Sequence, residues 1–431
     1  MSKEENRKNF SKYVSQNILG MIGFSCYVLA DSYFISIAKG ADGLTALNLV
    51  MPLYSIIFSI GEMIGVGSAI RYAISKIKKD ADADDYFWNA IIWCIMSSMI
   101  FVFAGIFFSS DIMRVLGADE HIVAVGNNYT KIFMCFAPMF MCNYVTNAFV
   151  RNDGAPGIAI SATLFSSLFN IVFDYILMFP MNLGMEGAAL ATALSPIIGM
   201  GICSIHFFSK KSSVRLVVCK PSVRKLVAGC QLGVSAFVGE MSSAVITLAF
   251  NFVILKLTGN VGVAAYGVVA NIAIVTTAVF NGVAQGSQPL ISSCFGRGDK
   301  DGCTQLKRMG YTTAFVLAAV MYSILFIFAE QFVAVFNSEG SEILRLYATE
   351  GVKLYFIGIF FAGINIVGGG AFSATEDAFK AAVVSVARGF VLILGAVFVM
   401  SALFGMTGVW LAYAVAEGIT TFIMLVMALR V

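Results

Sequence analysis

Histidine is scarce in this chain of 431 residues, and its cysteines do not cluster. The sequence has two His and nine Cys, with no Cys-x-x-Cys pair and no run that mixes Cys and His. Structural zinc sites and disulfide frameworks need such clusters, so neither organises this fold. A nucleotide-binding loop, a pore-loop signature and a cluster of His, Cys and carboxylates are missing too. These absences disfavour an ATP-driven pump, a channel and an enzyme.

Charge is also scarce, because only 12% of the residues are charged and 59% are hydrophobic. The mean hydropathy of +0.85 is too high for a soluble protein of this size. About twelve stretches are long enough to span a bilayer. We place them near residues 15–37, 48–75, 87–109, 122–149, 157–180, 186–208, 226–255, 263–294, 310–336, 343–373, 379–403 and 407–430. The sequence therefore predicts an all-α integral membrane protein, with the lipid bilayer rather than nucleic acid around it.

Basic residues are distributed unevenly between the two sets of loops. All but six of the 28 lie on the side of the N-terminus, with Arg388 counted there near a span end. Since cytoplasmic loops are rich in Lys and Arg, both termini and the polar linker 209–225 are predicted to be cytoplasmic. The linker has six basic residues and no acidic one. We interpret it as an ordinary cytoplasmic connection between two spans. The alternative is that it contacts anionic lipid. No signal-peptide pattern precedes the first span.

The chain repeats itself with a shift of about 220 residues. The segment 184–191 returns at 405–412, and Gly40, Gly67 and their neighbours return at Gly259 and Gly286. Such a repeat predicts two homologous six-helix bundles of the same topology that face a central cavity. The expected division is an N-terminal lobe 1–208, the linker 209–225 and a C-terminal lobe 226–431. This architecture suits a transporter that works by alternating access.

An aspartate stands in each of two predicted spans where an apolar side chain is expected. Asp31 lies in the first span and Asp174 in the fifth. A carboxylate at the bilayer centre costs about 2.5–3.5 kcal/mol, so such residues usually mark an ion or proton pathway. In the repeat, Asp31 falls on Phe250 and Asp174 on the apolar region 391–398. The acidic site therefore belongs to the N-terminal half alone.

Several oxygen-bearing residues surround Asp174 in the predicted helices. Asn170 precedes it by one helical turn, and Ala188 and Thr192 repeat that spacing on the next helix. Pro196 has no N–H, so the Thr192 carbonyl loses its helical partner. With the aspartate of the first span, these groups suit Na⁺ or a proton, and both ions stay open. Two close carboxylates do not both stay charged, so one takes a proton or a cation. The alternative is that both aspartates are merely hydrogen-bonded across helices.

A series of short motifs follows in a fixed order along the chain. They are Asp31, Pro52, Asn170-x-x-x-Asp174, Gly187-Ala188-Ala189-Leu190-Ala191-Thr192, and Gln288-Pro289-Leu290-Ile291 before Gly296. Together they resemble the multidrug and toxic compound extrusion (MATE) family, within a larger superfamily of flippases and exporters, over nearly the whole chain. The resemblance implies a cation site made of Asp31, Asn170, Asp174, Ala188 and Thr192. Na⁺, if it is the ion, would be held by Asp31, Asn170, Asp174 and Thr192.

The resemblance also bears on the C-terminal half. Other members carry acidic residues there, and Glu240 matches one of them, whereas Asn365 stands where the tenth span would carry another. That departure favours coupling through the N-terminal half. Candidate substrate-binding residues are Glu62, Glu240, Gln285, Gln288 and Asn365. For Glu62 and Glu240, a role in helix contacts is equally open.

The sequence thus predicts a secondary active multidrug exporter, in which Na⁺ or H⁺ moves in exchange for amphipathic, mostly cationic drugs. It is expected to need no cofactor beyond the coupling ion and to work as a monomer in the cell membrane. The main rival is a lipid-linked oligosaccharide flippase of the same superfamily, which would need a more basic cavity for its pyrophosphate. A major-facilitator exporter is disfavoured, because its Gly-x-x-x-Asp-Arg loop is missing after the second span.

Overall fold

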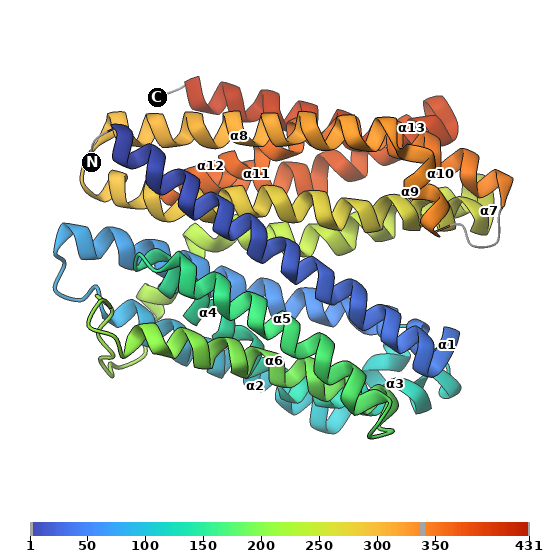
Figure 1. The fold of residues 1–431 in the computed structure, drawn as a ribbon, viewed down its shortest axis with the longest axis horizontal. Coiled ribbons are helices and arrows are strands. Elements are labelled where there is room, and N and C mark those ends of the chain that lie inside the picture. Colours follow the sequence, from blue (N-terminus) through green and yellow to red (C-terminus); the bar gives the residue numbers. More distant parts are fainter. Residues whose placement is uncertain (1–2, 337–340, 430–431) are drawn as a thin grey trace. The chain divides into compact units, whose positions relative to one another are not determined.

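A computed structural model describes residues 3–336 and 341–429, and these residues form helices joined by short connections. No strand occurs in this part of the chain, so the predicted all-α fold is confirmed. The elements, labelled in Figure 1 where there is room, are α1 (Lys3–Lys78), α2 (Asp85–Val115), α3 (Glu120–Cys135), α4 (Ala137–Asn152), α5 (Pro156–Met178), α6 (Gly184–Phe207), α7 (Val223–Gly296), α8 (Lys300–Ile327), α9 (Ala329–Phe336), α10 (Glu342–Tyr355), a 3₁₀ turn (Phe356–Gly358), α11 (Ile359–Ala374), α12 (Ala378–Val386), a π-helical turn (Ala387–Val391) and α13 (Leu392–Leu429).

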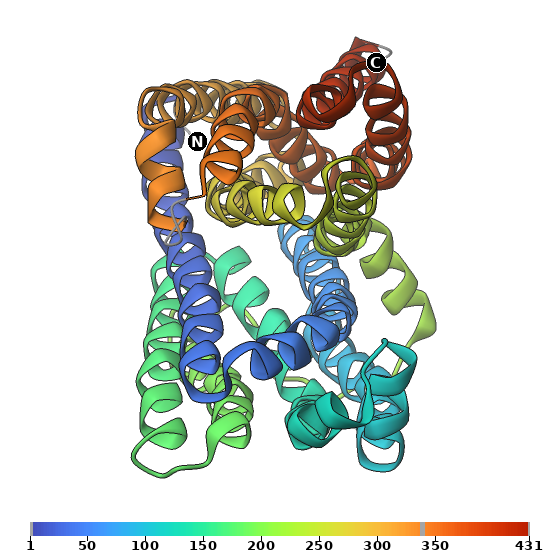
Figure 2. The ribbon, with the colours of Figure 1, turned by 90° about the vertical axis from the view of Figure 1, so that its right-hand side faces the viewer.

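Within the described residues, ten helices are long and apolar enough to cross a bilayer. The long helix α1 supplies two of them, Lys3–Lys39 and Thr45–Lys78, and Figure 2 shows the chain turning back between them. The long helix α7 likewise supplies Val223–Gly259 and Val261–Gly296. Each of these helices therefore holds two of the predicted spans.

The remaining differences from twelve single spans have local causes. The fourth span is the pair α3 and α4, bent by 46°, where Pro138 at the start of α4 removes a backbone donor. The helix Ala378–Ala428 is 51 residues long and holds the last two predicted spans. It breaks at Gly405, where φ is 58° and ψ is −135°. With the bent pair and this break counted, the structure accommodates twelve spans.

The predicted repeat agrees with the backbone at its clearest pair of glycines. Gly184 and Gly405 correspond in the repeat, and both have positive φ, of 50° and 58°. A residue with a side chain rarely adopts such angles, so glycine is required where the last helix of each half begins.

The contacts divide the chain into two compact units. Unit 1 comprises Met1–Ile18, Met241–Ile291 and Lys300–Val431, and unit 2 comprises Leu19–Glu240 and Ser292–Asp299. These units run differently from the predicted lobes 1–208 and 226–431. The start of α1 groups with C-terminal helices, and the start of α7 groups with N-terminal ones. The linker 209–225 lies wholly inside unit 2, so the chain passes from one unit to the other within helices α1 and α7.

Each exchanged helix start packs closely against its new neighbour. In unit 2, a Cβ on Gly67 would lie 2.0 Å from the backbone oxygen of Gly229. In unit 1, a Cβ on Gly286 would lie 2.7 Å from the Cα of Val14. Gly67 and Gly286 correspond in the repeat, so the two crossings are equivalent. Only glycine lets the backbones approach this closely, as is common between membrane helices.

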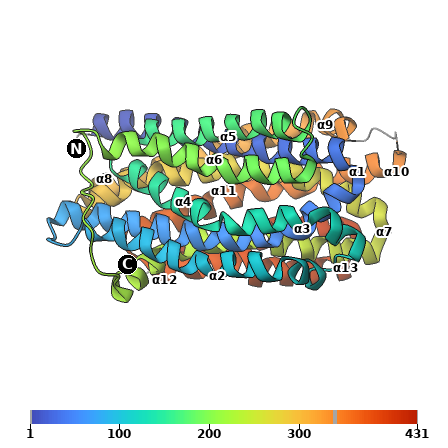
Figure 3. The ribbon, with the colours of Figure 1, turned by 90° about the horizontal axis from the view of Figure 1, so that it is seen from below.

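The packing inside each unit positions the site described below. In unit 2, α6 packs against α3, α4 and α5, and Figure 3 shows α5 and α6 side by side. In unit 1, α11 packs against α8, α12 and α13. Both the first residues of α1 and the last residues of α13 belong to unit 1, and Figure 1 shows them at the same end. Many large apolar side chains are exposed along these helices, for example Ile100 and Phe422. Such surfaces suit contact with lipid.

Candidate cation and substrate sites

Two carboxylates lie buried within membrane spans of unit 2. Asp31 on α1 is 7% exposed, and Asp174 on α5 is fully buried. The two charges are close enough to interact. The Oδ1 atom of each is buried and has no hydrogen-bond partner in the described part of the chain. A buried anionic oxygen without a partner is costly, so this arrangement calls for a proton or a cation.

Asn170 and Thr192 complete one side of this acidic site. In the orientation of the Asn170 amide that satisfies both of its ends, Nδ2 donates to Asp174 Oδ2 at 3.1 Å. The amide oxygen then accepts from the Thr192 hydroxyl, also at 3.1 Å. Ala188, one turn before Thr192 on α6, is fully buried as well. The structure therefore joins Asn170, Asp174 and Thr192 in one hydrogen-bonded set.

The Thr192 carbonyl behaves differently from our expectation. Pro196 does remove its helical donor, but Ser195 Oγ donates to this carbonyl at 3.0 Å. The carbonyl of Ser195 in turn accepts from Ser166 Oγ on α5 at 2.6 Å. The Ser195 hydroxyl thus replaces the helical bond that Pro196 removes. The Thr192 carbonyl is therefore not free, and the candidate oxygen ligands at this site are those of side chains.

The close contact of α5 and α6 brings these side chains together. A Cβ on Gly187 would lie 2.8 Å from the backbone carbonyl carbon of Leu177, so α6 begins directly against the end of α5. Three tyrosines that the sequence analysis did not single out interact electrostatically with Asp31, namely Tyr27, Tyr54 and Tyr129. The hydroxyls of Tyr54 and Tyr129 are hydrogen-bonded to each other. The sequence could have pointed to these tyrosines, because each is a polar aromatic residue in an otherwise apolar span.

A second pair of acids lies in unit 2. Glu62 on α1 and Glu240 on α7 interact with each other, and Glu62 also interacts with the buried Arg151. Both glutamates are half-buried. Tyr27 interacts with Glu240 as well as with Asp31. Tyr27 thus interacts with a member of each acidic pair, and both pairs belong to unit 2.

The match to a family model decides the family. The MatE model matches residues 17–176 and 236–399, which is most of the chain. The chain belongs to the MATE family. MATE proteins are efflux transporters, so this chain is a multi-pass membrane transporter, as the sequence predicted.

Known proteins agree with this placement in the MATE family. The multidrug export protein MepA of Staphylococcus saprophyticus is 26% identical over 410 residues, covering 93% of this chain and 89% of that protein. MepA of Staphylococcus aureus (strain MRSA252) is 27% identical over 414 residues, with the same coverage.

Solved structures support the same fold. An outward-facing multidrug resistance MATE transporter has a TM-score of 0.92 at 20% identity, covering 99% of this chain and 96% of that one. A transporter of the same superfamily from Pyrococcus furiosus, described as having a binding pocket of reverse polarity, has a TM-score of 0.90 at 19% identity, covering 98% and 95%. At these identities the likeness establishes the fold, and not the substrate.

The C-terminal half of this MATE transporter holds an acid that the sequence analysis missed. Asn365 on α11 is buried and donates to Glu417 Oε2 on α13 at 2.7 Å, while its amide oxygen accepts from the Thr421 hydroxyl at 3.0 Å. Arg388 of the π-helical turn donates to Glu417 Oε1 at 2.7 Å. Asn365 is thus engaged within unit 1, and the acid beside it comes from the last helix.

This ion pair corrects the placement of Arg388. We counted it with the loops near a span end, but it lies inside the helix Ala378–Ala428 and pairs with a glutamate that is 2% exposed. Arg388 lies about ten residues after a turn, and in a hydropathy profile a basic residue there looks like the end of a span. The sequence did not reveal its partner Glu417, which is 29 residues away. The other candidates in unit 1 are Gln288, which is buried, and Gln285, which is half-buried.

Proposed function

We propose that this MATE transporter is a multidrug exporter driven by exchange for Na⁺ or H⁺, and that Asp31 and Asp174 bind the coupling ion. The observation that carries the proposal is the pair of buried carboxylates, each with an oxygen that has no partner. Asn170 and Thr192 lie beside Asp174, and amide and hydroxyl oxygens are of the kind that a small cation prefers. The names of the related MepA proteins support multidrug export.

The cycle we propose uses these residues in turn. With the transporter open to the outside, a cation binds between Asp31 and Asp174 and neutralises their repulsion. The packing of the first span against α5 and α6 then changes, and the drug is released. The bundles rock, and the ion leaves to the cytoplasm. We propose that both termini and the linker lie on the cytoplasmic side, because their basic residues favour that side.

The energetics of this exchange depend on the charge of the drug. One monovalent cation exchanged for one monovalent cationic drug moves no net charge, so only the concentration gradients drive it, with about 1.4 kcal/mol per tenfold. A neutral drug adds the membrane potential, about 2.3 kcal/mol per 100 mV. Export of a neutral drug should therefore respond to the membrane potential, and export of a monovalent cation should not.

Glu62 and Glu240 are proposed to attract cationic substrates. They are half-buried, both are acidic, and they lie in the same unit as Asp31 and Asp174. Glu240→Gln should slow export of a cationic drug more than export of a neutral one. Equal effects on both drugs would assign Glu240 to helix packing. Acids of this kind do not suit the pyrophosphate of a lipid-linked oligosaccharide, which makes the flippase the weaker alternative.

Efflux from proteoliposomes tests the proposal. Ethidium efflux is followed under an imposed Na⁺ gradient and then under a pH gradient, for the native protein and for Asp174→Asn. One gradient should drive export in the native protein, and the variant should lose it while staying folded. Asp301→Asn, which changes an exposed acid at the start of α8, is the matched control and should export normally. Gradient-driven export that persists in Asp174→Asn would remove Asp174 from the site.

A further inference from the structure

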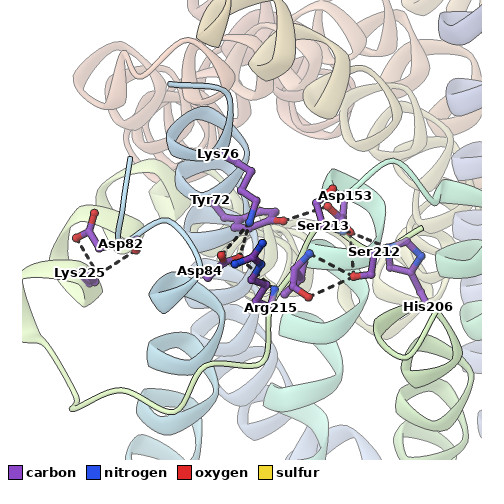
Figure 4. Close-up of polar contacts among 11 residues, drawn as sticks. Tyr72, Lys76, Asp82, Asp84, Asp153, His206, Ser212, Ser213, Arg215 and Lys225 are labelled. Carbon is purple, nitrogen blue, oxygen red and sulfur yellow. Dashed lines mark hydrogen bonds and ion pairs between the residues drawn. The ribbon is translucent and has the colours of Figure 1, made fainter. Parts of the chain in front are cut away.

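The linker between α6 and α7 is fixed to the end of unit 2 by buried polar groups. Asp153, after the end of α4, accepts from Tyr72 Oη at 3.1 Å, from Ser212 Oγ at 3.2 Å and from the backbone N–H of Ser213 at 2.8 Å. His206 Nε2 lies 2.8 Å from the same carboxylate. The side chains of Asp153 and His206 are only 4% and 3% exposed. Figure 4 shows these contacts converging on Asp153.

Two further contacts hold the linker backbone. The N–H of Arg215 donates to Asp84 Oδ1 at 3.1 Å, and the N–H of Ser222 donates to Asn89 Oδ1 at 2.6 Å. Asp84 also pairs with Lys76 at 2.7 Å. Because the backbone N–H of Arg215 makes its bond to Asp84, the exposed Arg215 side chain stays available for other contacts.

One basic residue at the end of the linker is used internally. Lys225 Nζ lies 2.9 Å from Asp82 and 2.6 Å from Asp85, and its side chain is 14% exposed. Figure 4 shows its contact with Asp82. This contact attaches the far end of the linker to the loop between α1 and α2.

The other five basic residues of the linker are exposed, and none of them forms an ion pair with a described residue. They are Lys210, Lys211, Arg215, Lys220 and Arg224. Exposed apolar residues alternate with them: Phe208, Leu216, Val217, Val218 and Val223. Phe208 and Val218 are 81% and 77% exposed. Since the segment contains no acidic residue, its free surface is both basic and apolar.

The position of residues 208–224 in the chain places their exposed basic and apolar side chains at the bilayer boundary. A membrane span ends at Phe207, directly before the segment, and the next begins at Val223. The segment is therefore tied to the membrane surface at both ends. Basic side chains near anionic headgroups and apolar side chains at the interface are the two contributions that hold peptide segments on membranes.

We propose that the exposed face of residues 208–224 binds the anionic phospholipids of the surrounding bilayer. The basic side chains contact the lipid phosphates, and the exposed Phe, Leu and Val side chains insert among the headgroups. Charge complementarity and position favour lipid over a second protein, because a lipid surface adjoins both ends of the segment. The linker then fastens unit 2 to one leaflet. This inference does not rest on the drug or on the coupling ion.

Fluorescence quenching tests the proposal with the full-length protein. The nine native cysteines are replaced, Val218→Cys carries the fluorophore, and quenching by brominated lipid is measured. The bilayers contain phosphatidylcholine alone or phosphatidylcholine mixed with phosphatidylglycerol. We expect strong quenching only with phosphatidylglycerol, and a decrease as salt rises. Each linker charge removed should lower the ratio of bound to detached linker by roughly fivefold.

Matched variants make the result decisive. Changing the five exposed basic residues of the linker to Gln should abolish the difference in quenching between the two bilayers. The control Lys8→Gln/Lys12→Gln changes exposed basic residues at the start of α1 and should leave the quenching unchanged. Equal quenching in both bilayers, or quenching that survives the five substitutions, would overturn the proposal. The fluorophore could instead become shielded as the protein density in the bilayer rises, whether or not phosphatidylglycerol is present. That result would assign the surface to contact with a second copy of the chain and would also overturn the proposal.

Discussion

Removing Glu417 should destabilise the protein far more than its single negative charge suggests. Its carboxylate is 2% exposed and accepts from Arg388 at 2.7 Å and from Asn365 at 2.7 Å. Glu417→Ala leaves the guanidinium unpaired in the membrane interior, which costs about 3–5 kcal/mol. Arg388→Ala should cost a similar amount, because it leaves the carboxylate unpaired. The double variant should cost less than the sum, since neither charge then remains.

A double-mutant cycle measures this coupling. Unfolding is followed in mixed micelles for the native protein, both single variants and the double variant, and we expect a coupling of about 2–3 kcal/mol. The exposed pair Arg345 and Glu342 is the control, with side chains 42% and 73% exposed, and should couple by less than about 1 kcal/mol. Additive effects at Arg388 and Glu417, within about 0.5 kcal/mol, would refute the reasoning.

Other consequences can be measured with single substitutions. Gly405→Ala should lower stability by about 1–3 kcal/mol, because φ is 58° there. The control Gly395→Ala should not lower it, because the space around the Cβ position is open. Equal unfolding midpoints for the two variants would contradict this prediction. Gly233→Ala should destabilise unit 2, since its Cβ would lie 2.0 Å from a backbone oxygen of the facing helix, and loss of that effect in a thermal unfolding assay would argue against the close crossing. Lys225 lowers the pKa of Asp82 by a hydrogen bond and by its charge, from an ordinary value of 3.8. The stabilisation is therefore present above that value and lost as the pH falls through the lowered pKa, so proteolysis of the linker should stay constant from about pH 8 to pH 5 and increase only in acid.

The fold was largely predictable because hydropathy records span length directly. The twelve stretches and the repeat, with its matching glycines at 184 and 405, appear in the printed sequence. Hydropathy does not record which helices pack together. It therefore gave no sign that the start of α1 groups with C-terminal helices, or that the start of α7 groups with N-terminal ones.

The candidate coupling site was predictable for a similar reason. Asn170 and Asp174 are one turn apart on a helix, and Thr192 lies on the helix that follows, so local spacing brought them together. The hydrogen bond from Ser195 to the Thr192 carbonyl could not be predicted, because a serine hydroxyl has several local acceptors to choose from. The contact of Arg388 with Glu417 joins distant segments through a π-helical turn, and no periodicity in the sequence indicates such a turn.

The most direct test of the coupling site is to run the exchange backwards. Proteoliposomes are given an outward or inward gradient of ethidium and no ion gradient, and the movement of Na⁺ and of protons is recorded. The account predicts that the drug gradient drives one of these ions in the opposite direction in the native protein, and that Asp31→Asn and Asp174→Asn abolish this ion movement. Ethidium transport without any ion movement, or ion movement that is unchanged in both variants, would contradict it.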